Sequence, residues 1–122
     1  MSETVKTITV ISKSSPGGND RAQTLMELVL ALGVFEQNLN LIFYADGVYQ
    51  LLDDQDSALL DRKNHAGSIQ ALDLYGIDKV FIDSDSLHTR GLTEEQLTLP
   101  ATLISPKEIS ALLAKASIVI NL

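Results

Sequence analysis

The chain has 122 residues, which suits a single domain over 1–122 with its own hydrophobic core, and it contains no cysteine. The absence of a thiol excludes disulfide and persulfide chemistry on the chain itself. Nine Lys and Arg against sixteen Asp and Glu give a net charge of -7, and the cations are scattered along the sequence. Such a chain repels phosphate backbones, so we expect no direct nucleic-acid binding.

Features of membrane insertion or secretion are not found in the sequence. The longest apolar runs fall well short of the roughly 20 residues that a membrane span requires. Residues 1–6 show no basic region leading into an apolar core, the pattern of a secretory signal peptide. We therefore expect a cytoplasmic protein without membrane contact.

Short apolar runs rich in β-branched residues alternate with segments of helical periodicity, as in successive βαβ units. A strand at 5–12 leads through turn-forming residues to a helix that ends near Gly33. The apolar positions expected on its buried face are 22, 25, 26, 28, 29 and 32. A near-continuous apolar strand at 38–44 predicts cover on both of its faces. A turn at Asp46 and Gly47 precedes a short helical segment through Leu52, and the polar residues 53–64 predict a surface excursion.

The second half of the chain continues the alternation. A helix at 66–74 ends at Gly76, a strand follows at 79–83, and residues 93–100 predict a loop. A strand at 102–104, a helix at 106–115 that Pro106 suits to begin, and a strand at 117–122 complete the pattern. The expected fold is a three-layer, doubly wound α/β sandwich, flavodoxin-like, with a mainly parallel five-stranded sheet.

Ligands of such folds gather at the carboxyl ends of the strands, and the first loop there is Ser14 to Asn19. It could present backbone N–H groups and a helix N-terminus to a small anion. Neither the six-position glycine fingerprint nor a Gly-Lys-Ser/Thr loop is present, so an ordinary turn and helix cap is favoured. A stand-alone flavodoxin-like domain binding a small anionic ligand at this loop is the alternative function.

Asp83 and Asp85 follow an apolar strand with the spacing seen in aspartate-dependent phosphatases. That chemistry also needs further carboxylates for magnesium and a lysine for the phosphoryl group, and no second acidic pair follows a strand. We expect Asp83 and Ser84 to cap the helix that leads to Leu87.

The third loop, residues 46–52, carries too many apolar groups to be wholly solvent-facing. Tyr49 and Leu52 lie three apart, and each suits either the core or an exposed contact with another subunit, where aromatic residues are favoured. The two histidines, His65 and His88, have no second ligand at zinc-like spacing, so we expect neither a metal nor a cofactor.

Four segments together resemble the TusC/DsrF family of the DsrE/DsrF-like fold: residues 44–52, 74–77, 86–87 and 90–92. Their order and spacing agree with the family over essentially the whole chain. The resemblance implies a subunit of a sulfur-relay complex that passes persulfide sulfur between carriers. In the Tus branch this sulfur ends in 2-thiouridine at the tRNA wobble position, and in the Dsr branch it serves sulfur oxidation.

The resemblance also implies the chain's place in that complex. The expected partners are TusB/DsrH-type and TusD/DsrE-type siblings in a dimer of heterotrimers, and the persulfide cysteine belongs to the D/E-type subunit. Judged from the Arg-Gly-Leu stretch at 90–92, the corresponding position here is close to Asp83, which cannot carry a persulfide. The implied role is a non-catalytic partner rather than an enzyme. The expected interface residues are Tyr49 and Leu52, with Asp83 and Arg90 on a loop at its edge.

Overall fold

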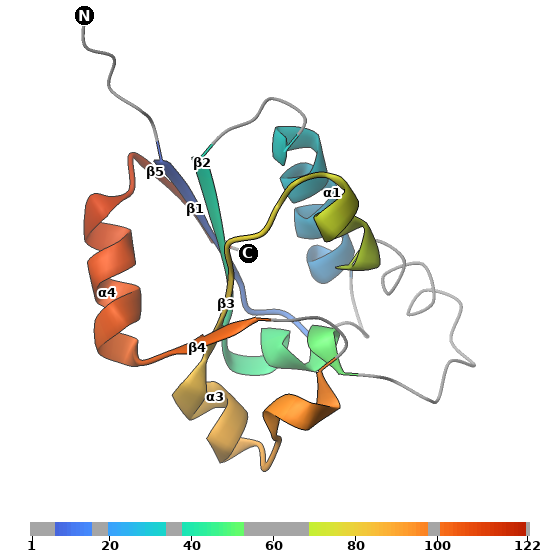
Figure 1. The fold of residues 1–122 in the computed structure, drawn as a ribbon, viewed down its shortest axis with the longest axis vertical. Helices are drawn as coiled ribbons and strands as arrows, with labels where there is room; N and C mark the ends of the chain where they lie inside the picture. The colour runs from blue at the N-terminus through green and yellow to red at the C-terminus, as the bar shows by residue number, and fades with distance from the viewer. Residues whose placement is uncertain (1–6, 16–19, 34–37, 53–68, 98–100, 122) are drawn as a thin grey trace, which may run out of the picture.

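The computed structural model describes residues 7–15, 20–33, 38–52, 69–97 and 101–121 (Figure 1). Its centre is a parallel sheet of five strands in the order β4-β3-β2-β1-β5. The strands are β1 (Thr7–Ser12), β2 (Asn38–Phe43), β3 (Val80–Asp83), β4 (Thr102–Ile104) and β5 (Ile118–Asn121). The predicted α/β fold with a parallel sheet is confirmed, and β4 has the predicted bounds.

The strand order determines which helices cover which face. From β1 to β4 the chain steps across the sheet in one direction, and it then returns past β1 to add β5. Because crossovers between parallel strands are right-handed, steps in opposite directions place their helices on opposite faces. Helix α1 (Arg21–Gly33) and the helical residues 69–74 accordingly lie on one face, and α4 (Pro106–Lys115) lies on the other (Figure 1). The order reverses between β1 and β5, whereas in flavodoxin it reverses between the first and third strands.

The two faces of the sheet are covered unequally. On the face of α1, a large core joins strands, both helices and the segment after β2; its fully buried members include Val10, Leu25, Met26, Leu41, Phe43, Leu51, Leu72 and Ile82. On the face of α4 only Ile42, Ile104 and Ile109 form the buried cluster, with Phe81, Leu112 and Leu113 packed at its edge. The central strand β2 is buried on both faces, as its apolar run predicted.

Helix ends follow the local sequence. Ser105 caps α4 by accepting the backbone N–H of Glu108, and the Glu108 carboxylate accepts the Ser105 N–H at 2.8 Å. This reciprocal pair and Pro106 explain why α4 has its predicted bounds. After residues 69–74, Gly76 adopts a φ of 77°, and the N–H of Ile77 donates to the carbonyl of Leu72, which confirms the predicted helix end.

Some predictions needed correction. Leu28, expected on the buried face of α1, is 40% exposed, and Leu32 is half-buried. The predicted loop at 93–100 contains a short 3-10 helix, η2 (Glu94–Gln96), because the Gln96 side chain accepts the Thr93 N–H at 2.8 Å. The predicted excursion at 53–64 lies outside the described residues, as do 66–68 of the third helix and the ends of the first and last strands. No helix in the described ranges is long and apolar enough to cross a membrane.

Candidate functional site

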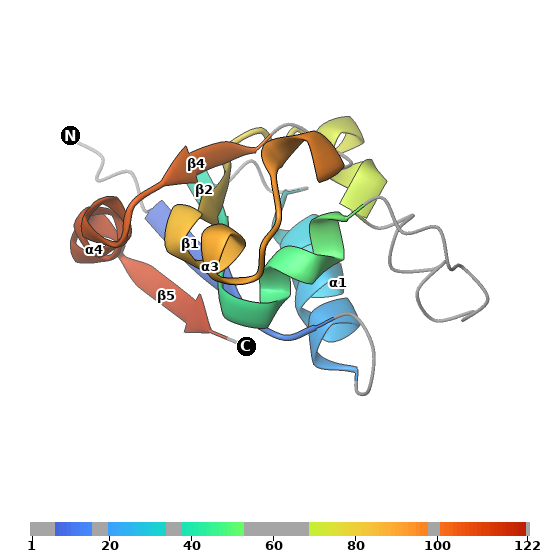
Figure 2. The same cartoon turned by 90° about the horizontal axis from the view of Figure 1, so that it is seen from below.

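Two short helical segments meet at the carboxyl ends of β2 and β3. The 3-10 helix η1 (Ala45–Leu51) follows β2, and α3 (Ser84–Thr89) follows β3. Because β2 and β3 are neighbours in the sheet, the two segments leave it side by side and contact each other (Figure 2). This surface is the candidate site, and most of the site residues expected from the sequence lie on it.

Asp83 is the last residue of β3 and directly precedes α3, beneath this surface. Its Oδ2 accepts the backbone N–H of Ser86 at 3.0 Å and the Ser86 hydroxyl at 2.6 Å. The side chain therefore caps the helix, as predicted. Asp83 is only 2% exposed, so any contribution to an interface acts through the residues above it. Its Oδ1 is buried and has no hydrogen-bond partner among the described residues.

Ser86 links the two segments through the backbone of Ala45. The Ser86 hydroxyl oxygen accepts the Ala45 N–H at 2.9 Å. Ala45 has a φ of 51°, in the left-handed region that non-glycine residues seldom adopt. This backbone strain lies where β2 ends, beside Tyr44, whose side chain is 41% exposed. Such strain persists only when the surrounding structure holds it, and it is common at functional sites.

Arg90 joins the end of α3 to η1. Its Nε and Nη2 donate to Oδ1 of Asp46 at 3.1 and 2.9 Å, and its Nη1 donates to the Ser86 carbonyl at 3.2 Å. The guanidinium carbon lies 6.0 Å from the centroid of the Tyr49 ring, within reach of a cation–π contact. The structure thus brings Tyr49 and Arg90 together. The role of Asp46 in holding Arg90 was missed, since its pairing with Arg90 spans 44 residues of sequence.

Leu52 lies just beyond η1 and is half-buried. It forms an isolated antiparallel bridge with Leu97, which follows η2. Leu52 therefore connects η1 to the segment after α3 at a different place from the contact between Tyr49 and Arg90. Both features border the carboxyl end of the sheet.

The loop that begins at Ser14 is tied to the same segment. Gln50, which is 5% exposed, donates from Nε2 to the Ser12 hydroxyl at 2.7 Å and to the Ser14 carbonyl at 2.9 Å. The Gln50 contacts were also missed by sequence reasoning. Residues 16–19, the rest of the loop for which anion binding was the alternative to an ordinary turn, lie outside the described residues.

The acidic pair does not form a metal site in the described part of the chain. Asp83 caps α3, and Asp85, in the first turn of that helix, is exposed. Among the described residues, no group of three or more His, Cys, Asp or Glu side chains is placed to hold a metal ion. His88 is exposed, and His65 lies outside the described residues.

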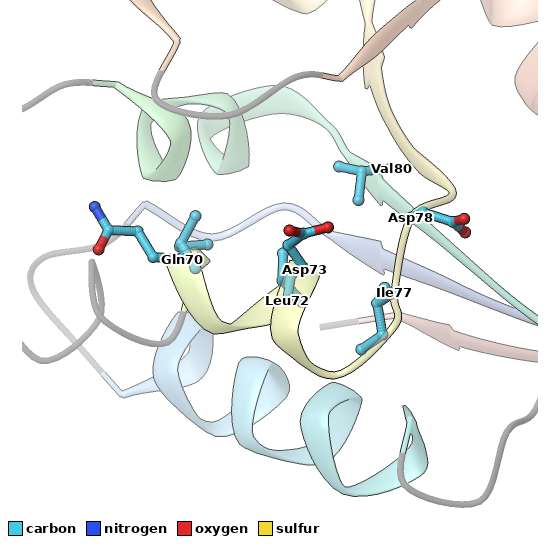
Figure 3. Close-up of a pocket in the computed structure, with 7 residues that line it drawn as sticks. Gln70, Leu72, Asp73, Ile77, Asp78 and Val80 are labelled. Atoms are coloured by element: carbon cyan, nitrogen blue, oxygen red, sulfur yellow. The ribbon is translucent and has the colours of Figure 1, made fainter.

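A separate cavity of about 260 Å³ lies at the opposite end of β3, beside the helical residues 69–74 (Figure 3). It is lined by Ile69, Gln70, Leu72, Asp73, Ile77, Asp78 and Val80. In Figure 3 the side chains of Gln70 and Asp78 are directed outward at either end, so the polar groups do not converge on one point. This arrangement lacks the convergent polar groups of a small-molecule site.

The sequence of the chain matches a known protein family. The profile of the DsrE/DsrF-like family matches residues 6–122. A TusC homolog of Pseudomonas aeruginosa is 32% identical over 117 residues, which cover 96% of this chain and 98% of that protein. The intracellular sulfur oxidation protein DsrF of Allochromatium vinosum is 36% identical over 97 residues, covering 80% and 71%.

Solved structures show the same fold at lower identity. The ychN protein of E. coli has a TM-score of 0.74 at 18% identity, with 96% of this chain and 99% of that chain covered. MTH1491 of Methanobacterium thermoautotrophicum, a protein of unknown function, has a TM-score of 0.69 at 16% identity and covers 98% of this chain. From its sequence and its fold, the chain belongs to the DsrE/DsrF-like family.

Proposed function

We propose that this chain is a non-catalytic structural subunit of a sulfur-relay complex that passes persulfide sulfur toward 2-thiouridine at the tRNA wobble position. One observation carries the proposal: a member of this family, similar to TusC and DsrF proteins, has no cysteine in its 122 residues. A persulfide is carried on a cysteine sulfur, so sulfur transfer takes place on a sibling subunit.

The proposal includes the partners and the location. The chain assembles in the cytoplasm with TusB/DsrH-type and TusD/DsrE-type siblings as a dimer of heterotrimers. The net charge of -7 supports a role in which the tRNA is contacted by other proteins of the relay.

The surface formed by Tyr44, Asp46, Tyr49 and Arg90 is the proposed contact with a sibling. Tyrosine and arginine dominate the energetics of many protein interfaces, because they bury large areas and still form hydrogen bonds. Tyr44 is 41% exposed, and Arg90 is held in place by Asp46. Asp83 supports this surface from below by capping α3, and Leu52 lies at its margin.

Replacing Tyr49 with Asp is expected to weaken assembly by about tenfold or more, because a charge would replace the ring against which Arg90 lies. The measurement is mass by light scattering after co-expression with both siblings. The unchanged chain should co-elute at the mass of two heterotrimers, and Tyr49→Asp should shift the mass toward free subunits.

Tyr75→Asp is the matched control, since Tyr75 is 46% exposed and its backbone lies beside Gly33, at the end of α1. It should leave the complex intact. A complex of unchanged mass with Tyr49→Asp would contradict the placement of the interface. Failure of the unchanged chain to co-elute with either sibling would contradict the subunit assignment itself.

A further inference from the structure

Helix α4 is the sole helix that the described residues place on its face of the sheet (Figure 2). Five strands spaced at about 4.8 Å make a surface roughly twice as wide as one helix. Of the ten residues of α4, only Ile109 is buried, and Leu112 and Leu113 are half-buried. Much of this helix and of the sheet beside it therefore remains exposed.

A groove of about 230 Å³ runs between α4 and the half of the sheet formed by β3 and β4. Its lining combines four apolar residues, Phe81, Ile104, Ala111 and Leu112, with the charged residues Glu108 and Lys115. Phe81 is half-buried although its strand, β3, has a neighbouring strand on either side. The groove thus presents an apolar strip with one acidic and one basic side chain.

The positions of the two charged side chains make the groove complementary to a second copy of itself. Glu108 and Lys115 are seven residues apart, which places them on the same side of α4, two turns and about 10 Å apart along its axis. Ala111 lies between them on that side, and its small side chain lets another helix approach closely. When two such helices run antiparallel, each Glu108 faces the Lys115 of the other.

We propose that this groove docks a second copy of the same chain, through antiparallel packing of the two α4 helices about a two-fold axis at Ala111. The same patch serves both copies, as in any two-fold interface. Two pairs between Glu108 and Lys115 flank the axis, and the apolar strip of each chain is covered by the other. The hydrogen bond from the Ser105 N–H fixes the Glu108 carboxylate without exhausting its roughly four acceptor positions.

This contact is independent of the sulfur-relay assignment, because it concerns copies of one chain and needs no sibling. A single helix pair is a small interface, so we expect a dissociation constant on the order of micromolar. The first measurement is sedimentation equilibrium of the purified chain between about 1 and 200 µM, a range chosen to bracket that constant. The expected mass rises from 13.2 kDa to twice that value.

Charge reversal tests the pairing. In Lys115→Glu each Glu108 meets an acidic side chain of the other copy, which should raise the dissociation constant at least about tenfold. Glu108→Lys should do the same, because two basic side chains then meet. An equimolar mixture of the two variants should dimerise again, because each acidic side chain then meets a basic one. Helix content from circular dichroism verifies that both variants are folded.

Lys107→Glu is the matched control. It makes the same change of charge on an exposed residue of α4 that does not line the groove, and it should leave the dimer unchanged. The proposal is overturned if the unchanged chain stays monomeric across the range, or if Lys115→Glu dimerises as well as the unchanged chain. It is also overturned if the mixed variants remain apart, or if Lys115→Glu impairs only binding to a sibling.

Discussion

Replacing Gly47 with alanine is expected to lower the free energy of unfolding by about 3 kcal/mol or more, the largest effect of an added methyl group among the glycines that the structure describes. A Cβ at this position would lie 1.9 Å from the carbonyl oxygen of Ser12 and 3.1 Å from the Cα of Lys13. Both obstacles are backbone atoms, so no side-chain rotation relieves the clash. The Ser12 carbonyl also accepts the N–H of Tyr44, and its displacement would disturb the end of the β1–β2 pair.

Thermal and urea unfolding followed by circular dichroism measure this effect, and a fall in melting temperature of about 10 °C is expected. Gly76→Ala is the control. Gly76 has a φ of 77°, but no atom lies within 4 Å of the position that a Cβ would occupy, so only backbone strain of about 1 kcal/mol should result. Equal losses for the two variants would mean that the close approach of η1 to β1 does not determine stability.

The second large effect is expected from Asp83→Ala, which should cost about 2–4 kcal/mol. The substitution removes the cap of α3 and leaves two donors of the buried Ser86 without their acceptor. Ser86 in turn accepts the N–H of Ala45, so the loss should extend to η1. Unfolding experiments measure the energy, and hydrogen exchange of the Ala45 and Ser86 amides should report the local loosening.

Asp83→Asn separates the capping role from the charge. Asparagine is as good a helix cap as aspartate, and its carbonyl oxygen can accept both donors of Ser86. It also removes the negative charge from a buried group whose Oδ1 has no partner among the described residues. Stability within about 1 kcal/mol of the unchanged chain is therefore expected. A loss as large as that of Asp83→Ala would show that the carboxylate charge, rather than the hydrogen bonds, holds α3.

Local sequence signals were sufficient to predict most elements of the fold. The helix at 106–115 was predicted at its observed bounds because Pro106 marks its first turn, and the end at Gly76 followed from a backbone conformation that glycine adopts readily. The 3-10 turn at 94–96 was missed although Thr93 and Gln96 show the three-residue spacing of a capping box. Leu28 fits the helical period but lies on the exposed side of α1, since the position of a helix over its sheet determines which residues are covered.

The candidate site was predicted only in part. Strand ends and residue types pointed to Tyr49, Leu52, Asp83 and Arg90, and the capping role of Asp83 was predicted from its place before a helix. The contacts of Arg90 with Asp46 and of Gln50 with Ser12 depend on the order of strands in the sheet. Right-handed crossovers allow several strand orders, so sequence spacing alone did not specify which loops would meet.

The pairing of β5 with β1 has a consequence for synthesis of the protein. Ile118 pairs with Ile8, and the N–H of Ser117 donates to the carbonyl of Thr7, 110 residues earlier in the chain. While residues 118–121 are still inside the ribosome, β1 exposes the backbone groups of its outer edge to other nascent chains. Unpaired edges of this kind are sites of aggregation during folding. Of all the strand pairs in this sheet, the one that protects β1 is the last to become available.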